Sequence, residues 1–240
     1  MTTRISFAIP AQPTETTCGP TCLHAVYRYY GDDISLDQVI AETRALREGG
    51  TLDAFLADHA LRRGYRATIY MHNLSLFDPT WFDLSKSAII DKLRHQWAIK
   101  EARHPKIAIA TKGYIDFLEM GGELKIADLT GKLLRYYLSR GTPVMTGLSS
   151  TWLYRTPREL DDTTEDDLNG EPVGHFVVLS GYDRDKREVW VADPYEGNPF
   201  SEARSYPVKI ERLIASVLLG VVSFDCNLLV IEPGKRSIGA

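Results

Sequence analysis

The amino-acid sequence predicts an α+β fold in which helices come first and an antiparallel β-sheet follows. Between residues 18 and 64, apolar side chains recur at steps of three and four positions, which is the period of an amphipathic helix. From residue 175 onward, runs of β-branched and aromatic residues alternate with turn-forming residues, which indicates strands joined as hairpins. Helix-forming and strand-forming segments that stay apart along a chain are typical of this class.

The first third of the chain is predicted to be helical and compact. A helix begins at or just after Cys18, because Pro20 fits a first helical turn, where a missing N–H costs nothing. Ser35 opens a second helix with capping-box spacing, and Thr51 is expected to cap a third. The predicted elements are helix 18–31, helix 35–46, helix 51–64 and strand 65–70.

The rest of the chain is predicted to alternate between helices and strands. Residues 71–127 are interpreted as a helical insertion, and residues 149–174 as a long, mobile, acidic loop without periodicity. The acidic residues of this loop are Asp161, Asp162, Glu165, Asp166 and Asp167. A run of acidic residues is usually just a solvent-exposed surface. That this loop is a lid over an active site is the less favoured alternative. The other predicted elements are helices 85–103, 106–120 (in part), 128–138 (capped by Asp128 or Thr130) and 208–215, and strands 144–148, 175–182, 188–192 and a last pair within 218–231.

The composition is that of an ordinary globular protein and excludes several function classes. The chain has 240 residues, of which 44% are hydrophobic and 25% charged, and we expect one domain over residues 1–240. A net charge of −4 argues against a nucleic-acid partner, which would need a broad basic face. No apolar run is long enough to span a membrane, and the N-terminus lacks a secretory pattern, so we expect cytoplasmic residence without membrane insertion.

The segment around Cys18 has the features of a nucleophilic site. Unsatisfied N–H groups at a helix N-terminus favour a thiolate over a thiol, and a thiolate is a nucleophile. Gln12 lies six positions upstream in a proline-flanked, extended segment, so its side-chain amide could return to the thiol and donate to an oxyanion. The alternative is that Cys18 is a small buried hydrophobic residue and Gln12 a surface residue.

The other two cysteines, Cys22 and Cys226, are interpreted as core residues. Three cysteines do not suggest a disulfide framework, and the four-residue step from Cys18 to Cys22 is neither a redox C-x-x-C motif nor zinc-knuckle spacing. No histidine or acidic pair has metal-ligand spacing with support around it. We therefore expect neither a metal nor a cofactor.

A thiol nucleophile needs a base, and His175 is the best-placed histidine. It opens a predicted strand directly after Gly174, and the following strand of the hairpin ends at Asp193. The two positions lie nearly equally far from the predicted turn, so antiparallel pairing would bring them together. The Asp193 carboxylate could then accept a hydrogen bond from the His175 ring and orient it. Taken alone, His175 could simply begin a capped strand, and Asp193 could simply form an Asp-Pro turn with Pro194.

Taken together, these motifs resemble those of the C39 and C39-like branch of the papain-like cysteine peptidases, over residues 8–70 and 128–232. The matching positions are Gln12, the box Thr17–Leu23, Gly50 to Leu52 with Gly64, the segment Gly174–Tyr182, and Ala192 to Pro194. The resemblance implies a papain-like fold, Cys18 as nucleophile, His175 as base, Asp193 as the orienting acid and Gln12 as oxyanion donor. It also implies a peptide substrate.

The sequence departs from many members of that family, which are parts of exporters that cut leader peptides after Gly-Gly. This chain has neither apparent membrane helices nor a P-loop, so exporter-coupled cleavage is not implied. Three functions remain open: a cysteine peptidase, an acyltransferase or transpeptidase with the same acyl-enzyme, and a peptide-binding module without catalysis. The sequence leaves the substrate, the cleavage position and the oligomeric state open.

Overall fold

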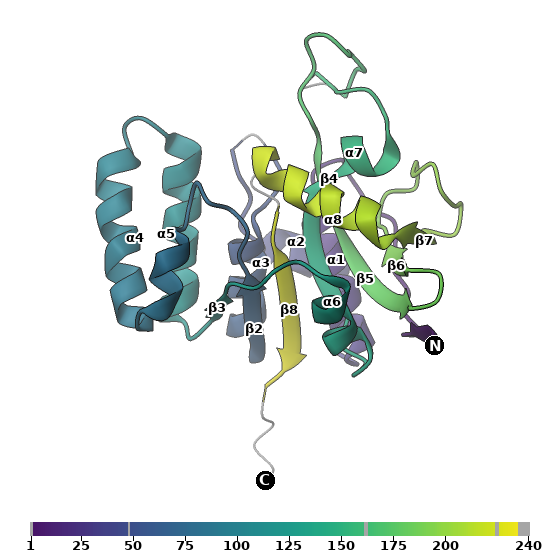
Figure 1. Ribbon diagram of the computed structural model, residues 1–240, viewed down its shortest axis with the longest axis horizontal. Helices are drawn as coiled ribbons and strands as arrows, with labels where there is room; N and C mark the ends of the chain where they lie inside the picture. The colour runs from purple at the N-terminus through teal and green to yellow at the C-terminus, as the bar shows by residue number, and fades with distance from the viewer. Residues whose placement is uncertain (1, 48, 161–162, 224–225, 235–240) are drawn as a thin grey trace, which may run out of the picture.

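The computed structural model shows a β-sheet with helices on both faces (Figure 1). It describes residues 2–47, 49–160, 163–223 and 226–234. The helices are α1 (Cys18–Tyr29), α2 (Leu36–Glu42), α3 (Asp53–Arg62), α4 (Lys86–Lys100), α5 (Pro105–Glu119), α6 (Gly131–Leu138), α7 (Ser150–Tyr154) and α8 (Ile210–Leu219), with short 3₁₀ turns η1 (Pro79–Asp83) and η2 (Gly220–Ser223). The strands are β1 (Thr2–Arg4), β2 (Tyr65–Tyr70), β3 (Glu123–Lys125), β4 (Val144–Ser149), β5 (Gly174–Asp183), β6 (Glu188–Ala192), β7 (Ser205–Lys209) and β8 (Leu228–Pro233).

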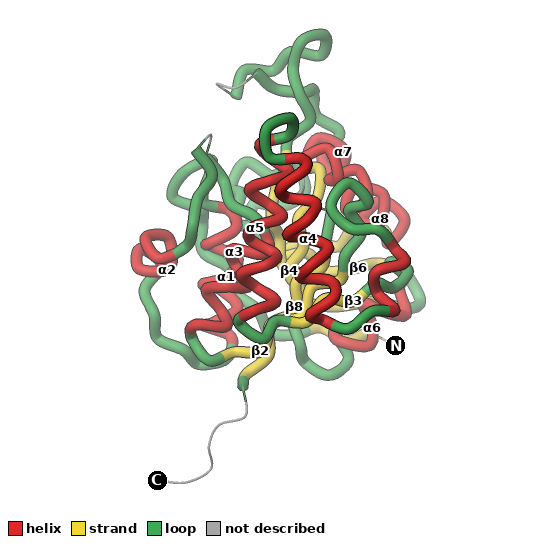
Figure 2. The backbone as a smooth tube through the Cα atoms, turned by 90° about the vertical axis from the view of Figure 1, so that its left-hand side faces the viewer, coloured by secondary structure: helices red, strands yellow, loops and turns green. Residues whose placement is uncertain are grey.

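The sheet is almost wholly antiparallel. Within the described residues its strand order is β3-β2-β8-β4-β5-β6-β7, and β1 pairs with β5 outside that path. Among the strands that the structure describes, only β2 and β3 pair in parallel. Helices α1 and α3 lie on one face of the sheet, and α6 and α8 lie on the other (Figures 1 and 2). The predicted α+β class is confirmed, and the sheet carries helices on both faces.

The N-terminal helices follow the predicted periodicity, with two corrections. Helix α1 begins at Cys18, as predicted, and Ser35 caps α2 by accepting from the Gln38 N–H. Helix α2 is shorter than predicted, because Thr43 leaves the helical conformation and bonds back to the Val39 carbonyl. Thr51 does not cap α3: its hydroxyl donates to the Arg44 carbonyl, and residue 52 occupies the cap position.

Further corrections concern short elements. The prediction that residues 149–174 are entirely loop was wrong at its start, where α7 forms; Asp161 and Asp162 lie outside the described residues. The predicted strand pair within 218–231 was also wrong, because Leu218 and Leu219 end α8 and β8 is the one strand there among the described residues. Strands β1, β3 and β7 were not predicted. Two of these have three residues each, too few to show alternation.

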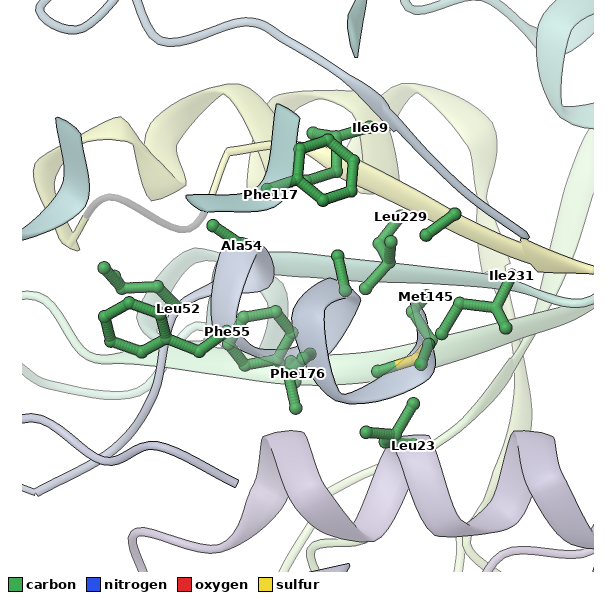
Figure 3. Close-up of a cluster of buried hydrophobic side chains, with 14 of the residues drawn as sticks. Leu23, Leu52, Ala54, Phe55, Ile69, Phe117, Met145, Phe176, Leu229 and Ile231 are labelled. Carbon is green, nitrogen blue, oxygen red and sulfur yellow. The ribbon is translucent and has the colours of Figure 1, made fainter. Parts of the chain in front are cut away.

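Two apolar cores, one on each face of the sheet, result from side-chain alternation along the strands. On β5, Phe176 and Val178 face the core shared with α1 and α3, whereas Val177 and Leu179 face the core shared with α6 and α8. Figure 3 shows Phe176 beside Phe55 of α3. A central strand that is buried on both faces is a rigid support, so the residue at its start, His175, has a fixed position.

The hairpin of α4 and α5 lies at one side of the molecule and is held by a buried polar contact (Figure 1). Asp53 of α3 is only 4% exposed. It accepts hydrogen bonds from the Tyr114 hydroxyl of α5 at 2.6 Å and from the Asn227 amide, next to β8, at 2.7 Å. Burial raises the pKa of the Asp53 carboxyl, although these bonds oppose the rise. This contact therefore joins the hairpin to both α3 and the sheet.

Tyr114→Phe is expected to lower the free energy of unfolding by about 1.5 to 3 kcal/mol, because a buried carboxylate loses a donor. Urea denaturation followed by circular dichroism measures it. Tyr136→Phe is the matched control, because Tyr136 is 51% exposed, and it should stay within about 0.5 kcal/mol of the wild type. Equal losses in the two variants would contradict the anchoring role of Tyr114.

Candidate active site

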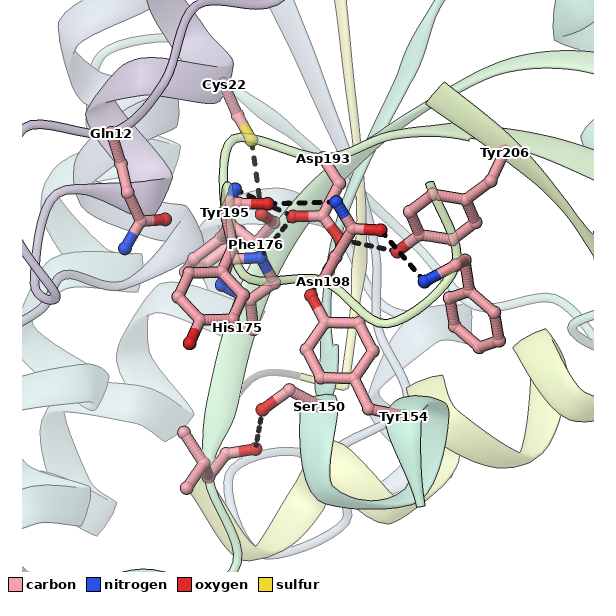
Figure 4. Close-up of polar contacts among 12 residues, drawn as sticks. Gln12, Cys22, Ser150, Tyr154, His175, Phe176, Asp193, Tyr195, Asn198 and Tyr206 are labelled. Carbon is pink, nitrogen blue, oxygen red and sulfur yellow. Dashed lines mark hydrogen bonds and ion pairs between the residues drawn. The ribbon is translucent and has the colours of Figure 1, made fainter. Parts of the chain in front are cut away.

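His175 and Asp193 meet at one end of the β5–β6 hairpin. His175 is the second residue of β5, and Asp193 directly follows β6. A bulge between Leu179 and Gly181 shifts the register by one, and Val178 then pairs with Ala192. The His175 Nε2 and Asp193 Oδ1 atoms are 2.8 Å apart. The structure thus brings together the two residues that the hairpin register predicts to be neighbours (Figure 4).

The Asp193 carboxylate is fully buried and its two oxygens are saturated with donors. Its Oδ1 accepts from the His175 ring and from the Tyr195 N–H at 2.9 Å. Its Oδ2 accepts from the Tyr154 hydroxyl at 2.6 Å and from the Tyr206 hydroxyl. A charge with 0% exposure is stable only with such partners, so the surroundings of Asp193 are built for an anion.

The pKa of Asp193 is lowered and that of His175 is raised, as expected for a buried ion pair. Burial alone would raise the pKa of Asp193, but the charge and hydrogen bond of His175, together with the two tyrosine hydroxyls, lower it. Burial alone would lower the pKa of His175, but the charge and hydrogen bond of Asp193, and then the Cys18 thiol, raise it to about 10. His175 is therefore an imidazolium at neutral pH.

Cys18 is the first residue of α1. Its side chain is near enough to the His175 ring to contribute to the raised pKa of the imidazole, after the larger effect of Asp193. Cys22, one turn along α1, is fully buried and its thiol donates to the Phe176 carbonyl at 3.2 Å. Burial raises the pKa of Cys22, as expected for a core thiol.

All three cysteines are buried. The prediction that Cys22 and Cys226 are core residues is confirmed, since their exposed fractions are 0% and 1%. Cys18 differs from both by its place at a helix start beside an imidazole. Burial alone therefore does not distinguish Cys18 from the two core cysteines in this chain.

Gln12 is close to the site, and one hydrogen of its side-chain amide is donated within its own segment. Its backbone N–H donates to the Pro194 carbonyl at 2.9 Å, so the segment before α1 is tied to the residue after Asp193. Its side-chain Nε2 donates to the Thr14 carbonyl at 3.0 Å, and its buried Oε1 has no hydrogen-bond partner. In the view of Figure 4 the amide oxygen, rather than the nitrogen, is on the His175 side. The oxyanion role of Gln12 stays a prediction.

A cavity of about 300 Å³ opens beside His175 and Gln12. Besides His175, its charged lining includes three glutamates, Glu15, Glu159 and Glu165, from the segment before α1 and from the acidic loop. Burial and the charges of Glu15 and Glu165 raise the pKa of Glu159. No described lysine or arginine forms an ion pair with these three side chains. The cavity is therefore a negatively charged space next to the imidazole.

Sequence reasoning missed the tyrosines around Asp193. Tyr154 ends α7, which was predicted as loop, and Tyr206 lies on β7, which was not predicted. Tyr195 contributes its backbone N–H, which any residue at that position could supply. An aromatic residue in a strand or loop has no pattern of its own that indicates a polar contact, so no signal in the sequence could have found this cluster.

The order of Cys18, His175 and Asp193 along the chain can be compared with known families. The profile of the Peptidase_C39 like family matches residues 4–214. The chain belongs to this family. The resemblance drawn from the sequence motifs is thereby confirmed, and the match includes the segment between residues 71 and 127. No curated protein matches the chain significantly in sequence.

One solved structure supports the fold of this C39-like chain, and two others are similar at a lower TM-score. A proposed C39-like peptidase from Bacillus anthracis is similar over 95% of this chain and 96% of its own, with 15% identity and a TM-score of 0.51. Xylellain, a cysteine protease from Xylella fastidiosa, is similar over 98% of this chain and 86% of its own, with 14% identity and a TM-score of 0.49. The peptidase domain of Streptococcus ComA is similar over 95% of this chain and 98% of its own, with 13% identity and a TM-score of 0.45. The likeness to the Bacillus anthracis structure shows a shared fold.

Two further searches of the described residues gave negative results. They contain no group of three or more histidine, cysteine, aspartate or glutamate side chains arranged to hold a metal ion. Among the helices of the described part, none combines the length and apolar character that crossing a bilayer requires.

Asp193→Asn is expected to destabilise the protein in a pH-dependent way. The folded pKa of His175, about 10, is above its unfolded value of about 6.5, so the pair stabilises the protein fully below about pH 6.5 and loses this effect as the pH rises through about 10. The loss relative to wild type should be about 3 kcal/mol at pH 6 and should shrink toward pH 10. Urea denaturation at pH 6, 8 and 10 measures this change.

The control for this prediction is Asp33→Asn. The Asp33 side chain is 95% exposed in its ion pair with Arg28, so its removal should have an effect near zero over the same pH range. A loss in Asp193→Asn that is constant between pH 6 and pH 10 would show that His175 does not hold a proton against Asp193.

Proposed function

We propose that this C39-like chain is a cysteine peptidase that cleaves a peptide or a related amide with Cys18 as nucleophile. The observation that supports it most is the place of the His175 ring, which contacts the Asp193 carboxylate at 2.8 Å and whose pKa is also raised by the Cys18 side chain. This is the arrangement that a thiol nucleophile, its base and an orienting acid require.

In the proposed reaction the Cys18 sulfur attacks the substrate carbonyl carbon, and His175 holds the proton that the thiol gave up. His175 then gives this proton to the leaving amine as the C–N bond breaks, which leaves a thioester on Cys18. Water attacks the thioester while His175 takes its proton, and the acid product leaves as the proton returns to sulfur. Asp193 stays ionised throughout and keeps the ring in place.

The negative charge on the carbonyl oxygen needs donors in the transition state. The backbone N–H of Cys18, at the start of α1, is one candidate, because the first N–H groups of a helix lack intrahelical partners. Gln12 becomes the second donor if its amide turns so that Nε2, and not Oε1, faces the site. When substrate binds, the Gln12 Nε2 would then donate its hydrogen bond to the oxyanion instead of to the Thr14 carbonyl.

Cys18→Ala is expected to abolish hydrolysis, because no other described thiol contacts the imidazole. Product formation from a mixture of peptides, followed by mass spectrometry, measures this loss. Cys226→Ala is the matched control and should retain turnover, since Cys226 is a buried thiol away from His175. Iodoacetamide should also modify Cys18 faster than Cys226 in the folded protein. Equal turnover by wild type and Cys18→Ala would refute the peptidase.

The charge of the cavity predicts a substrate preference. Peptides with lysine or arginine near the scissile bond should have a kcat/KM roughly tenfold higher than matched peptides with glutamate, because three carboxylates line the space beside His175. Glu159→Gln should reduce this ratio, and added salt should reduce it as well. Glu171→Gln is the control, since Glu171 lies in the same loop but does not line the cavity. A ratio that neither Glu159→Gln nor salt changes would contradict the prediction.

A further inference from the structure

Two tyrosine hydroxyls from separate elements converge on one oxygen of Asp193. Tyr154 is the last residue of α7, and Tyr206 lies on β7, which pairs with β6. Tyr206 is opposite Val191, two positions before Asp193, so the strand register places both side chains on the same face. Both hydroxyls donate to Oδ2, the oxygen that does not contact His175 (Figure 4).

We propose that Tyr154 and Tyr206 are positioning residues, which hold the Asp193 carboxylate in the orientation that His175 requires and share its negative charge. The inference rests on the proposed function, because it assigns these residues a role in the same reaction. Neither hydroxyl contacts the sulfur or the substrate carbonyl in this proposal. They act through Asp193 and His175.

The first part of the argument is geometric. A carboxylate bound only at Oδ1 could rotate about its χ2 bond, and such rotation would release the His175 ring. Two donors on Oδ2 fix the plane of the carboxylate. Without them Oδ2 would be buried and unsatisfied, which is costly for a charged group. Burial and the Asp193 charge also raise the pKa of both tyrosine hydroxyls, so they stay protonated donors.

The second part concerns the proton on His175. Donors on Oδ2 withdraw negative charge from Oδ1 and weaken the pull of the carboxylate on the imidazolium. His175 must release a proton to the leaving amine, so a carboxylate that holds the imidazolium too strongly would slow this step. Loss of one hydroxyl should therefore raise the pKa of His175 further and lower kcat.

The two tyrosines can be separated by experiment, because only Tyr154 lines the cavity beside His175. Its ring also packs against Tyr195, with ring centroids 6.2 Å apart. Tyr206 is 2% exposed and packs against Phe200, away from the cavity lining. Tyr206→Phe therefore removes the hydroxyl without altering the substrate space, and a change in kcat without a change in KM is its expected signature.

The test compares Tyr206→Phe with Tyr137→Phe in the full chain. Tyr137 is a matched control, because its hydroxyl is also buried and bonds to another hydroxyl, that of Tyr70, at 2.7 Å. Tyr206→Phe should lower kcat about tenfold, with KM within about twofold, and should move the alkaline limb of the kcat profile upward by about half a pH unit. Tyr137→Phe should leave kcat and the profile unchanged.

A second readout does not need turnover. Nuclear magnetic resonance titration of ¹⁵N-labelled histidine, assigned with His175→Ala, reports the His175 pKa in each variant. We expect a higher value in Tyr206→Phe than in wild type and no change in Tyr137→Phe. An unchanged His175 titration in Tyr206→Phe, or an unchanged kcat profile, would overturn the positioning role. If instead wild type and Cys18→Ala show the same turnover, the peptidase fails, and the titration still decides whether the tyrosines act on His175.

Discussion

The buried charge of Asp193 is the constraint on which the candidate site depends. An anion with 0% exposure must be matched by donors, and its donors come from β5, α7, β7 and the turn after β6. These segments have to converge for the fold to be stable at all. The same convergence orients the His175 ring toward α1. In this chain, therefore, the free energy that keeps the carboxylate satisfied also positions the imidazole, and stability and site geometry cannot be changed independently.

The sequence predicted the parts of the site that depend on local rules. The start of α1 at Cys18 follows from Pro20 and the helical period, and the approach of His175 to Asp193 follows from hairpin pairing. Both involve residues close in sequence or related by one turn. The expected approach of Cys18 to His175 relates segments 157 positions apart, and no periodicity joins them. That expectation came from the need of a thiol nucleophile for a base and from the family resemblance, both of which carry information that local propensity lacks.

The failures have physical causes of a different kind. Strands β1 and β3 have three residues each and owe their conformation to a neighbouring strand rather than to their own side chains. The apolar run at the end of α8 reads equally as strand or helix, and packing against the sheet decides it. Tyr154 and Tyr206 were missed because a hydroxyl acquires a polar partner only through tertiary structure. Polar contacts between distant elements are thus the least predictable part of such a site.

The carboxylates around His175 fall into two kinds that differ in how their charge is compensated. Asp193 is satisfied within the protein, so it has a structural partner for every acceptor and needs none from solution. Glu15, Glu159 and Glu165 have no described basic partner, and their mutual repulsion contributes to the raised pKa of Glu159. Like charges kept together at a cost in free energy are compensated most readily by a cation that enters from outside. The compensated carboxylate thus holds the His175 ring, and the uncompensated ones face whatever occupies the cavity.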